Sequence, residues 1–117
     1  YTGPISLLAM LGGSEKIQNW YPLMNRLEKN QCWLWLQLHN VDVQLCYAMR
    51  WQVLQNGTPI ERRPIKIEKP HTIGYSLTTR IKAGESCVLR KYVAVVDSRY
   101  HKKENLITDA IKCLTNL

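Results

Sequence analysis

Apolar and polar side chains alternate along most of this chain, and the alternation is longest at residues 41–53. Every odd position in this stretch is apolar: Val41, Val43, Leu45, Tyr47, Met49, Trp51 and Val53. Successive side chains of a strand point to opposite faces of a sheet, so this period of two predicts one long strand with a single buried face. Leu45 and Met49 are therefore expected in the core.

Shorter runs predict further strands at residues 5–11, 33–38, 60–69, 73–81 and 86–96. The Asn56-Gly57 pair is typical of a hairpin turn, because both residues tolerate positive φ angles. Three prolines, at positions 59, 64 and 70, make the run at 60–69 an edge strand or a broken one. Residues 87–97 are apolar on both faces, which predicts an inner strand covered on both sides.

Two segments depart from this alternation. Residues 15–30 have weak periodicity and are expected to form an irregular connection with a helical turn around 23–27. Near the C-terminus, Ile107, Ala110, Ile111 and Leu114 recur at helical spacing, which predicts one amphipathic helix over about 102–114. The predicted fold class is mainly β, an antiparallel β-sandwich at residues 1–100 followed by a C-terminal helix at 101–117.

Composition limits the partners of such a fold. The chain has 117 residues, enough for one domain with a modest core, and no apolar run approaches the length of a membrane span. The 16 Lys and Arg against 9 Asp and Glu give a net charge of +7, but the cations are dispersed. Their clearest cluster is Arg99, His101, Lys102 and Lys103, which fits a solvated face. Neither a membrane nor nucleic acid is expected as a partner.

The residues do not form a motif of catalysis or metal binding. The four cysteines, at positions 32, 46, 87 and 113, are scattered without CxxC spacing, so reduced structural thiols, a cytoplasmic location and no metal or cofactor are expected. No phosphate-binding loop or nucleophile motif occurs. The strand-associated carboxylates Asp42 and Asp97, and Glu85 in a turn, have no evident partner for acid–base work, so no catalytic residue is assigned.

The tryptophans are the remaining candidates for ligand contacts. Trp51 lies on the predicted buried face and is interpreted as core. Trp33 and Trp35 share one strand face, which either packs against another part of a longer protein or binds a ligand such as a carbohydrate. The chain starts without Met, which favours a piece excised from a longer protein. Such a piece is expected to self-associate through open strand edges or the face of Trp33 and Trp35.

Three segments resemble the N-terminal β-sandwich region of glycoside hydrolase family 65, the family of maltose, trehalose and kojibiose phosphorylases and related hydrolases. They are residues 5–13 with Asn19, the strand VDVQLCYAMRW at 41–51, and residues 83–99, where a Gly-Glu turn precedes a strand with Lys91 and a final Ser-Arg. Gly12 stands where the family usually has Asp, and Asp97 where it usually has Thr.

The resemblance implies part of a larger sandwich, a supersandwich of the galactose-mutarotase type. In that family the catalytic glutamate and the phosphate-binding residues belong to a helical barrel whose motifs are not found here. The chain is then a non-catalytic domain with a structural and assembly role in an enzyme acting on α-linked disaccharides such as maltose. The helix at 101–117 would begin the linker to the barrel. The expected partners are the remainder of the parent chain and further copies, with carbohydrate as a ligand of the parent.

A second hypothesis comes from a different class of protein. The chain would be a free-standing β-sandwich module that uses Trp33 and Trp35, with nearby basic residues, to bind carbohydrate or nucleic acid. Binding to nucleic acid would weaken steeply as salt rises, because phosphate contacts release counterions.

Overall fold

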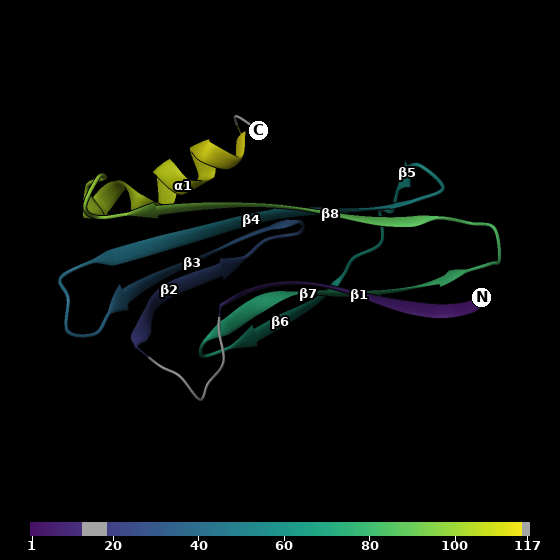
Figure 1. The fold of residues 1–117 in the computed structure, drawn as a ribbon, viewed down its shortest axis with the longest axis horizontal. Helices are drawn as coiled ribbons and strands as arrows, with labels where there is room; N and C mark the ends of the chain where they lie inside the picture. The colour runs from purple at the N-terminus through teal and green to yellow at the C-terminus, as the bar shows by residue number, and fades with distance from the viewer. Residues whose placement is uncertain (13–18, 116–117) are drawn as a thin grey trace.

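A computed structural model describes residues 1–12 and 19–115, which form two antiparallel sheets packed face to face (Figure 1). This confirms the predicted β-sandwich with one C-terminal helix. The smaller sheet has the order β1-β7-β6, with bounds Gly3–Gly12, Thr72–Ile81 and Ile65–Lys69. In the larger sheet the order is β2-β3-β4-β5, with β8 also paired to β4. The strands of the larger sheet are β2 (Trp20–Leu27), β3 (Gln31–Leu38), β4 (Gln44–Gln55), β5 (Thr58–Pro59) and β8 (Cys87–Asp97).

The main core fills the space between the two sheets. Tyr75 of β7 is fully buried there, and its ring stacks on Trp51 of β4 with 5.3 Å between centroids. Its hydroxyl lies 2.5 Å from the carbonyl oxygen of Glu28 and 2.7 Å from that of Gln31, so its proton ties the smaller sheet to the β2–β3 turn. The remaining buried members are Ala9, Leu11, Cys32, Leu34, Leu36, Met49, Val53, Ile73 and Leu77.

A second apolar cluster lies on the outer face of the larger sheet, under helix α1 (Leu106–Thr115), which follows a short 3-10 turn η1 (Lys103–Asn105). The helix buries Leu106, Ala110 and Leu114. Of the predicted stripe, Ala110 and Leu114 are buried, and Ile107 and Ile111 pack partly buried against the same cluster. Two contacts fix its start: His101 Nδ1 lies 2.8 Å from Asp109 Oδ2, and Lys103 Nζ lies 2.8 Å from Asp42 Oδ1. From the sheet, the cluster takes Trp33, Cys46, Ala48, Ala94 and Val96.

The central strand β4 is buried on both faces for this reason. Its odd positions Met49, Trp51 and Val53 face the main core, as the alternation predicts. Its even positions Cys46 and Ala48 pack under α1. The hairpin turn after β4 also has the predicted chemistry, since Asn56 and Gly57 have φ angles of 51° and 79°. Within the described residues, no helix is long and apolar enough to cross a membrane.

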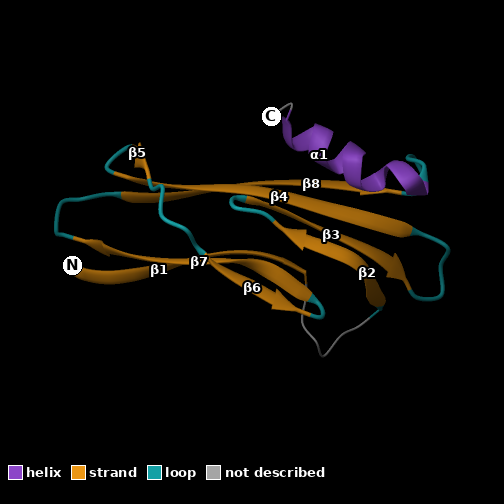
Figure 2. Cartoon of the chain, turned by 180° about the vertical axis from the view of Figure 1, so that it is seen from behind, coloured by secondary structure: helices purple, strands orange, loops and turns teal. Residues whose placement is uncertain are grey.

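Three local expectations are wrong. Part of the segment expected to be irregular forms strand β2 (Trp20–Leu27). The sequence does not show the alternation of a strand here, because a register shift occurs between Pro22 and Met24. Residues 41–43 belong to the turn before β4, where Asn40 has a φ of 63°. The strand expected at 60–69 is shorter than predicted, since only Ile65–Lys69 (β6) forms, but β6 lies at the edge of its sheet as the prolines predict. Figure 2 shows the preceding residues crossing from β5 to the smaller sheet. Residues 13–18, the end of one resemblance segment and the start of the expected connection, lie outside the described residues.

Candidate functional site

The carboxylates singled out from sequence all have partners of their own. Asp97, at the end of β8, accepts bonds from Arg99 Nε at 3.1 Å and from Arg99 Nη2 at 3.2 Å. Glu85, in the β7–β8 turn, accepts from Asn56 Nδ2 and from the Lys82 N–H, each at 2.7 Å. Asp42 is paired with Lys103. These contacts hold turns and the helix start in place.

Hydrogen bonding also sets the protonation of two of these groups. The bond from the Arg99 side chain holds the pKa of Asp97 below its ordinary value of 3.8. The bond from Asn56 lowers the pKa of Glu85 below 4.5. A general acid needs a pKa raised toward the working pH, so neither group is suited to that role.

The buried thiols are not suited to nucleophilic chemistry or metal binding. Burial raises the pKa of Cys32 and of Cys46 to about 12, which keeps both protonated at neutral pH. All four cysteines are free. Across residues 1–12 and 19–115, no three His, Cys, Asp or Glu side chains come together in a group that could hold a metal ion.

Trp33 and Trp35 lie on the face that α1 covers. Trp33 is only 7% exposed and belongs to the cluster under the helix. Trp35 is half-buried at the edge of that cluster, and its Nε1 donates to Gln44 Oε1 at 3.0 Å. The helix of the same chain therefore covers the face on which the sequence pattern predicts a longer protein or a ligand. A carbohydrate or interface contact of these two residues stays a prediction.

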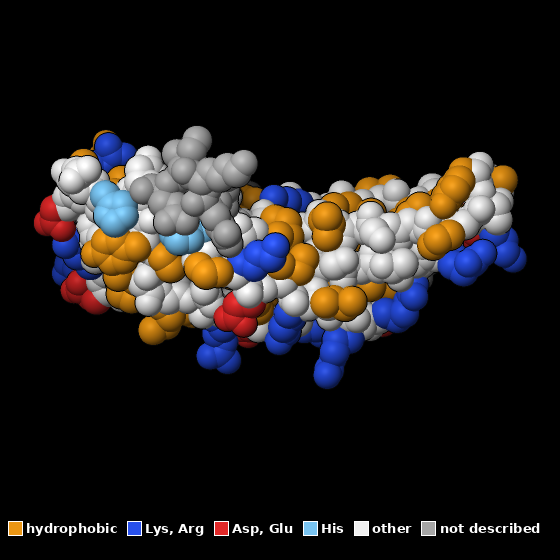
Figure 3. Space-filling view, turned by 90° about the horizontal axis from the view of Figure 1, so that it is seen from below, with side chains coloured by type: hydrophobic (Ala, Val, Ile, Leu, Met, Phe, Trp, Pro, Cys, Tyr) orange, Lys and Arg blue, Asp and Glu red, His pale blue; other side chains and the backbone are white. Residues whose placement is uncertain are grey.

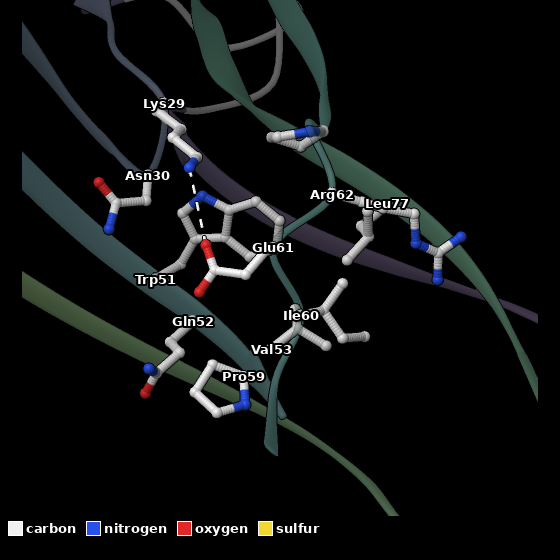
Figure 4. Close-up of a pocket in the computed structure, with 11 residues that line it drawn as sticks. Lys29, Asn30, Trp51, Gln52, Val53, Pro59, Ile60, Glu61, Arg62 and Leu77 are labelled. Atoms are coloured by element: carbon white, nitrogen blue, oxygen red, sulfur yellow. Dashed lines mark ion pairs between the residues drawn. The ribbon is translucent and has the colours of Figure 1, made fainter. Parts of the chain in front are cut away.

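A cavity of about 160 Å³ lies in a gap of the larger sheet, and no pattern in the sequence indicates it. The β3–β4 ladder ends at the pair Gln31 and Arg50, and β5 begins to pair with β4 only at Leu54. The crossing segment after β5 walls the gap (Figure 4). The lining residues are Lys29, Asn30, Trp51, Gln52, Val53, Pro59, Ile60, Glu61, Arg62, Pro64 and Leu77.

One long side of the sandwich is open. Strand β1 packs across β3 and β4, and β7 across β2 and β3, so the smaller sheet is offset from β8. Val93 and Val95, on the inward face of β8, are consequently 43% and 50% exposed. The expectation of an inner strand covered on both sides is wrong, because β8 pairs only with β4 among the described strands. Lys91 Nζ bridges the two sheets on this side by donating to the Met10 carbonyl at 2.8 Å.

The charged side chains on the outer face of the smaller sheet do not gather into a single patch. On the outer side of the smaller sheet, Lys and Arg lie dispersed among uncharged and hydrophobic groups (Figure 3). This agrees with the dispersion along the sequence, and this face has no strong, continuous patch for nucleic acid.

Together these features define a class of protein: an antiparallel β-sandwich domain without an acid–base pair among the candidate carboxylates. Residues 8–117 match the family described as glycosyl hydrolase family 65, N-terminal domain, and the chain belongs to this family. The resemblance found in the sequence is confirmed. This N-terminal domain is a non-catalytic part of glycoside phosphorylases and hydrolases. A search of curated proteins finds no match.

Proposed function

We propose that this chain is the structural sandwich portion of a family 65 enzyme that acts on α-linked disaccharides such as maltose. The family match over residues 8–117 is the observation that carries this proposal. The carboxylates bound to Arg99, Lys103 and Asn56 support a role outside the chemical step. The four free thiols fit a cytoplasmic enzyme.

The domain takes part in assembly through its open side, the edge at strand β8. An N-terminal domain is followed by further chain, and in the parent the remainder, including a helical barrel, covers the exposed valines of β8. The segment 101–117 then serves as the start of the linker, anchored to the sandwich by α1. In the isolated chain the same edge pairs with a second copy.

The hydrogen-bond register of β8 explains why this edge recruits strands. Ser98 N–H donates to Gln44 O, and Asn56 N–H donates to Ser86 O, so the even-numbered residues of β8 bond to β4. The main-chain groups of the odd-numbered residues, including Val93 and Val95, therefore point away from β4 along the open edge. A long edge strand with free main-chain groups and β-branched side chains is a template for pairing.

Sedimentation over a range of concentrations tests this proposal. The average mass of the isolated chain should rise with concentration, because β8 edges pair between copies. Replacing both valines (Val93→Lys, Val95→Lys) should give a monomer, since inward-facing charges block edge pairing. Val41→Lys, at an exposed valine in the β3–β4 turn, is the matched control and should associate like the unmodified chain. An unmodified chain that stays monomeric at the highest concentration would refute assembly through this edge.

A further inference from the structure

Helix α1 covers only part of the outer face of the larger sheet. Ala48 of β4 and Ala94 of β8 lie in the cluster under the helix. Toward β5 the same two strands continue, and no described helix lies over them there (Figure 1). Alternate residues of a strand share a face, so the side chains of this uncovered part follow from the strand pairing. They are Arg50, Gln52, Leu54, Val88, Arg90 and Tyr92, and we call them the arginine face.

The side chains of the arginine face are accessible from outside. In the register of β4 and β8, Arg50 lies opposite Tyr92 and Gln52 lies opposite Arg90. Gln52 and Arg90 are exposed, whereas Arg50 and Tyr92 are half-buried. Val88, on the same face of β8, is 46% exposed. A partner can therefore reach both arginines directly.

The two arginines have unused hydrogen-bond donors. The guanidinium carbon of Arg50 lies 5.3 Å from the centroid of the Tyr92 ring, a cation–π contact that orients the side chain. Within the described part of the chain, neither Arg50 nor Arg90 forms an ion pair or a side-chain hydrogen bond. A hollow of about 270 Å³ beside Arg50 is also lined by Asn30 and Gln52, whose amides supply further donors.

The charge of the arginine face is positive. None of its six residues is acidic. Arg50 and Arg90 are diagonal neighbours across the two strands, which places their Cβ atoms about 7–8 Å apart. Two guanidinium groups without carboxylate partners repel each other at such a distance, and a ligand that brings carboxylates between them relieves this repulsion. The face is therefore complementary to an acidic partner.

The remaining residues of the face favour a polypeptide among acidic partners. Val88 and Leu54 offer apolar contacts, and Arg and Tyr are enriched at the centres of protein interfaces. Nucleic acid is bound through many phosphate contacts, whereas this face has two cations beside an apolar pair. A second copy of the chain is disfavoured, because a two-fold contact would bring arginines against arginines.

We propose that the arginine face binds an acidic polypeptide segment. Arg50 and Arg90 each bond a carboxylate of the segment, and Val88 contacts its apolar side chains. This goes beyond the proposed function, because the outer face of the larger sheet is distinct from the edge through which β8 pairs with other strands.

A fluorescein-labelled hexaglutamate peptide is the probe for this site. Its fluorescence anisotropy should rise to saturation as the isolated chain is added. The affinity should fall as salt is added, because ions screen exposed charge pairs. Labelled hexaglutamine has the same length without the carboxylates and should show no rise.

Variants of single arginines locate the binding. Arg50→Gln and Arg90→Gln should each weaken the hexaglutamate peptide by about tenfold, the effect of losing a hydrogen bond between charged groups. Arg80→Gln is the matched control, because Arg80 is exposed on β7 of the smaller sheet and its loss changes the net charge equally. This control should bind like the unmodified chain. If Arg50→Gln does not fold without its contact to Tyr92, the exposed Arg90 carries the test.

Four results would overturn the proposal. The first is anisotropy that never saturates with hexaglutamate. The second is equal weakening by Arg80→Gln, which would assign the binding to net charge alone. The third is tighter binding of labelled hexathymidylate that the Arg50 and Arg90 variants weaken, which would assign the face to nucleic acid. The fourth is self-association that Arg90→Gln abolishes, which would assign the face to a second copy.

Discussion

Replacing Trp33 by Ala is expected to lower the free energy of unfolding by about 3–5 kcal/mol, the usual cost of truncating a buried aromatic side chain. Trp33 is 7% exposed and packs with Cys46, Ala94 and Leu106 in the cluster under α1. The variant would leave a cavity between the sheet and the helix. Denaturant unfolding of the two chains measures the difference.

Tyr100→Ala is the control for this prediction. Tyr100 is an exposed aromatic residue beside Arg99, and its loss should change stability by less than about 0.5 kcal/mol. If Trp33→Ala cost no more than this control, Trp33 would be at the surface. That result would favour the interpretation of Trp33 and Trp35 as ligand contacts.

Replacing Met49 by Ala is expected to cost about 2–5 kcal/mol, because its side chain is fully buried in the main core between the sheets. Met24 provides a matched control in the same molecule. It lies on edge strand β2 with 52% of its surface exposed, and Met24→Ala should be nearly neutral. Thermal or denaturant unfolding of both variants gives the comparison.

A cost for Met49→Ala as small as that for Met24→Ala would show that Met49 does not lie in the buried core.

The parts of the fold that the sequence predicts are those with strong local patterns. The odd-position alternation in β4, the Asn56-Gly57 turn and the i, i+3, i+4, i+7 stripe of α1 each appear in the structure. Strand β2 is not predicted, since the register shift after Pro22 removes the period of two that indicates a strand. Local pattern therefore works only where the pairing is regular.

Features that depend on where neighbouring strands end could not be predicted in the same way. The apolar residues on both faces of β8 indicate a covered strand, yet the offset of the smaller sheet leaves Val93 and Val95 exposed. The cavity at Trp51 arises because β3 stops pairing at Arg50 and β5 starts at Leu54. Pro59 and Pro64, which flank the charged segment 61–63, were the available signal that the chain leaves the sheet there.

The assignment as a non-catalytic domain is tested most directly by assaying the purified chain with maltose, in the presence and absence of inorganic phosphate. No release of glucose or of glucose phosphate above the buffer rate is expected, because Asp42, Asp97 and Glu85 are held by structural partners and do not form an acid–base pair. Reproducible turnover that disappears in Asp42→Asn, Asp97→Asn or Glu85→Gln would contradict the assignment.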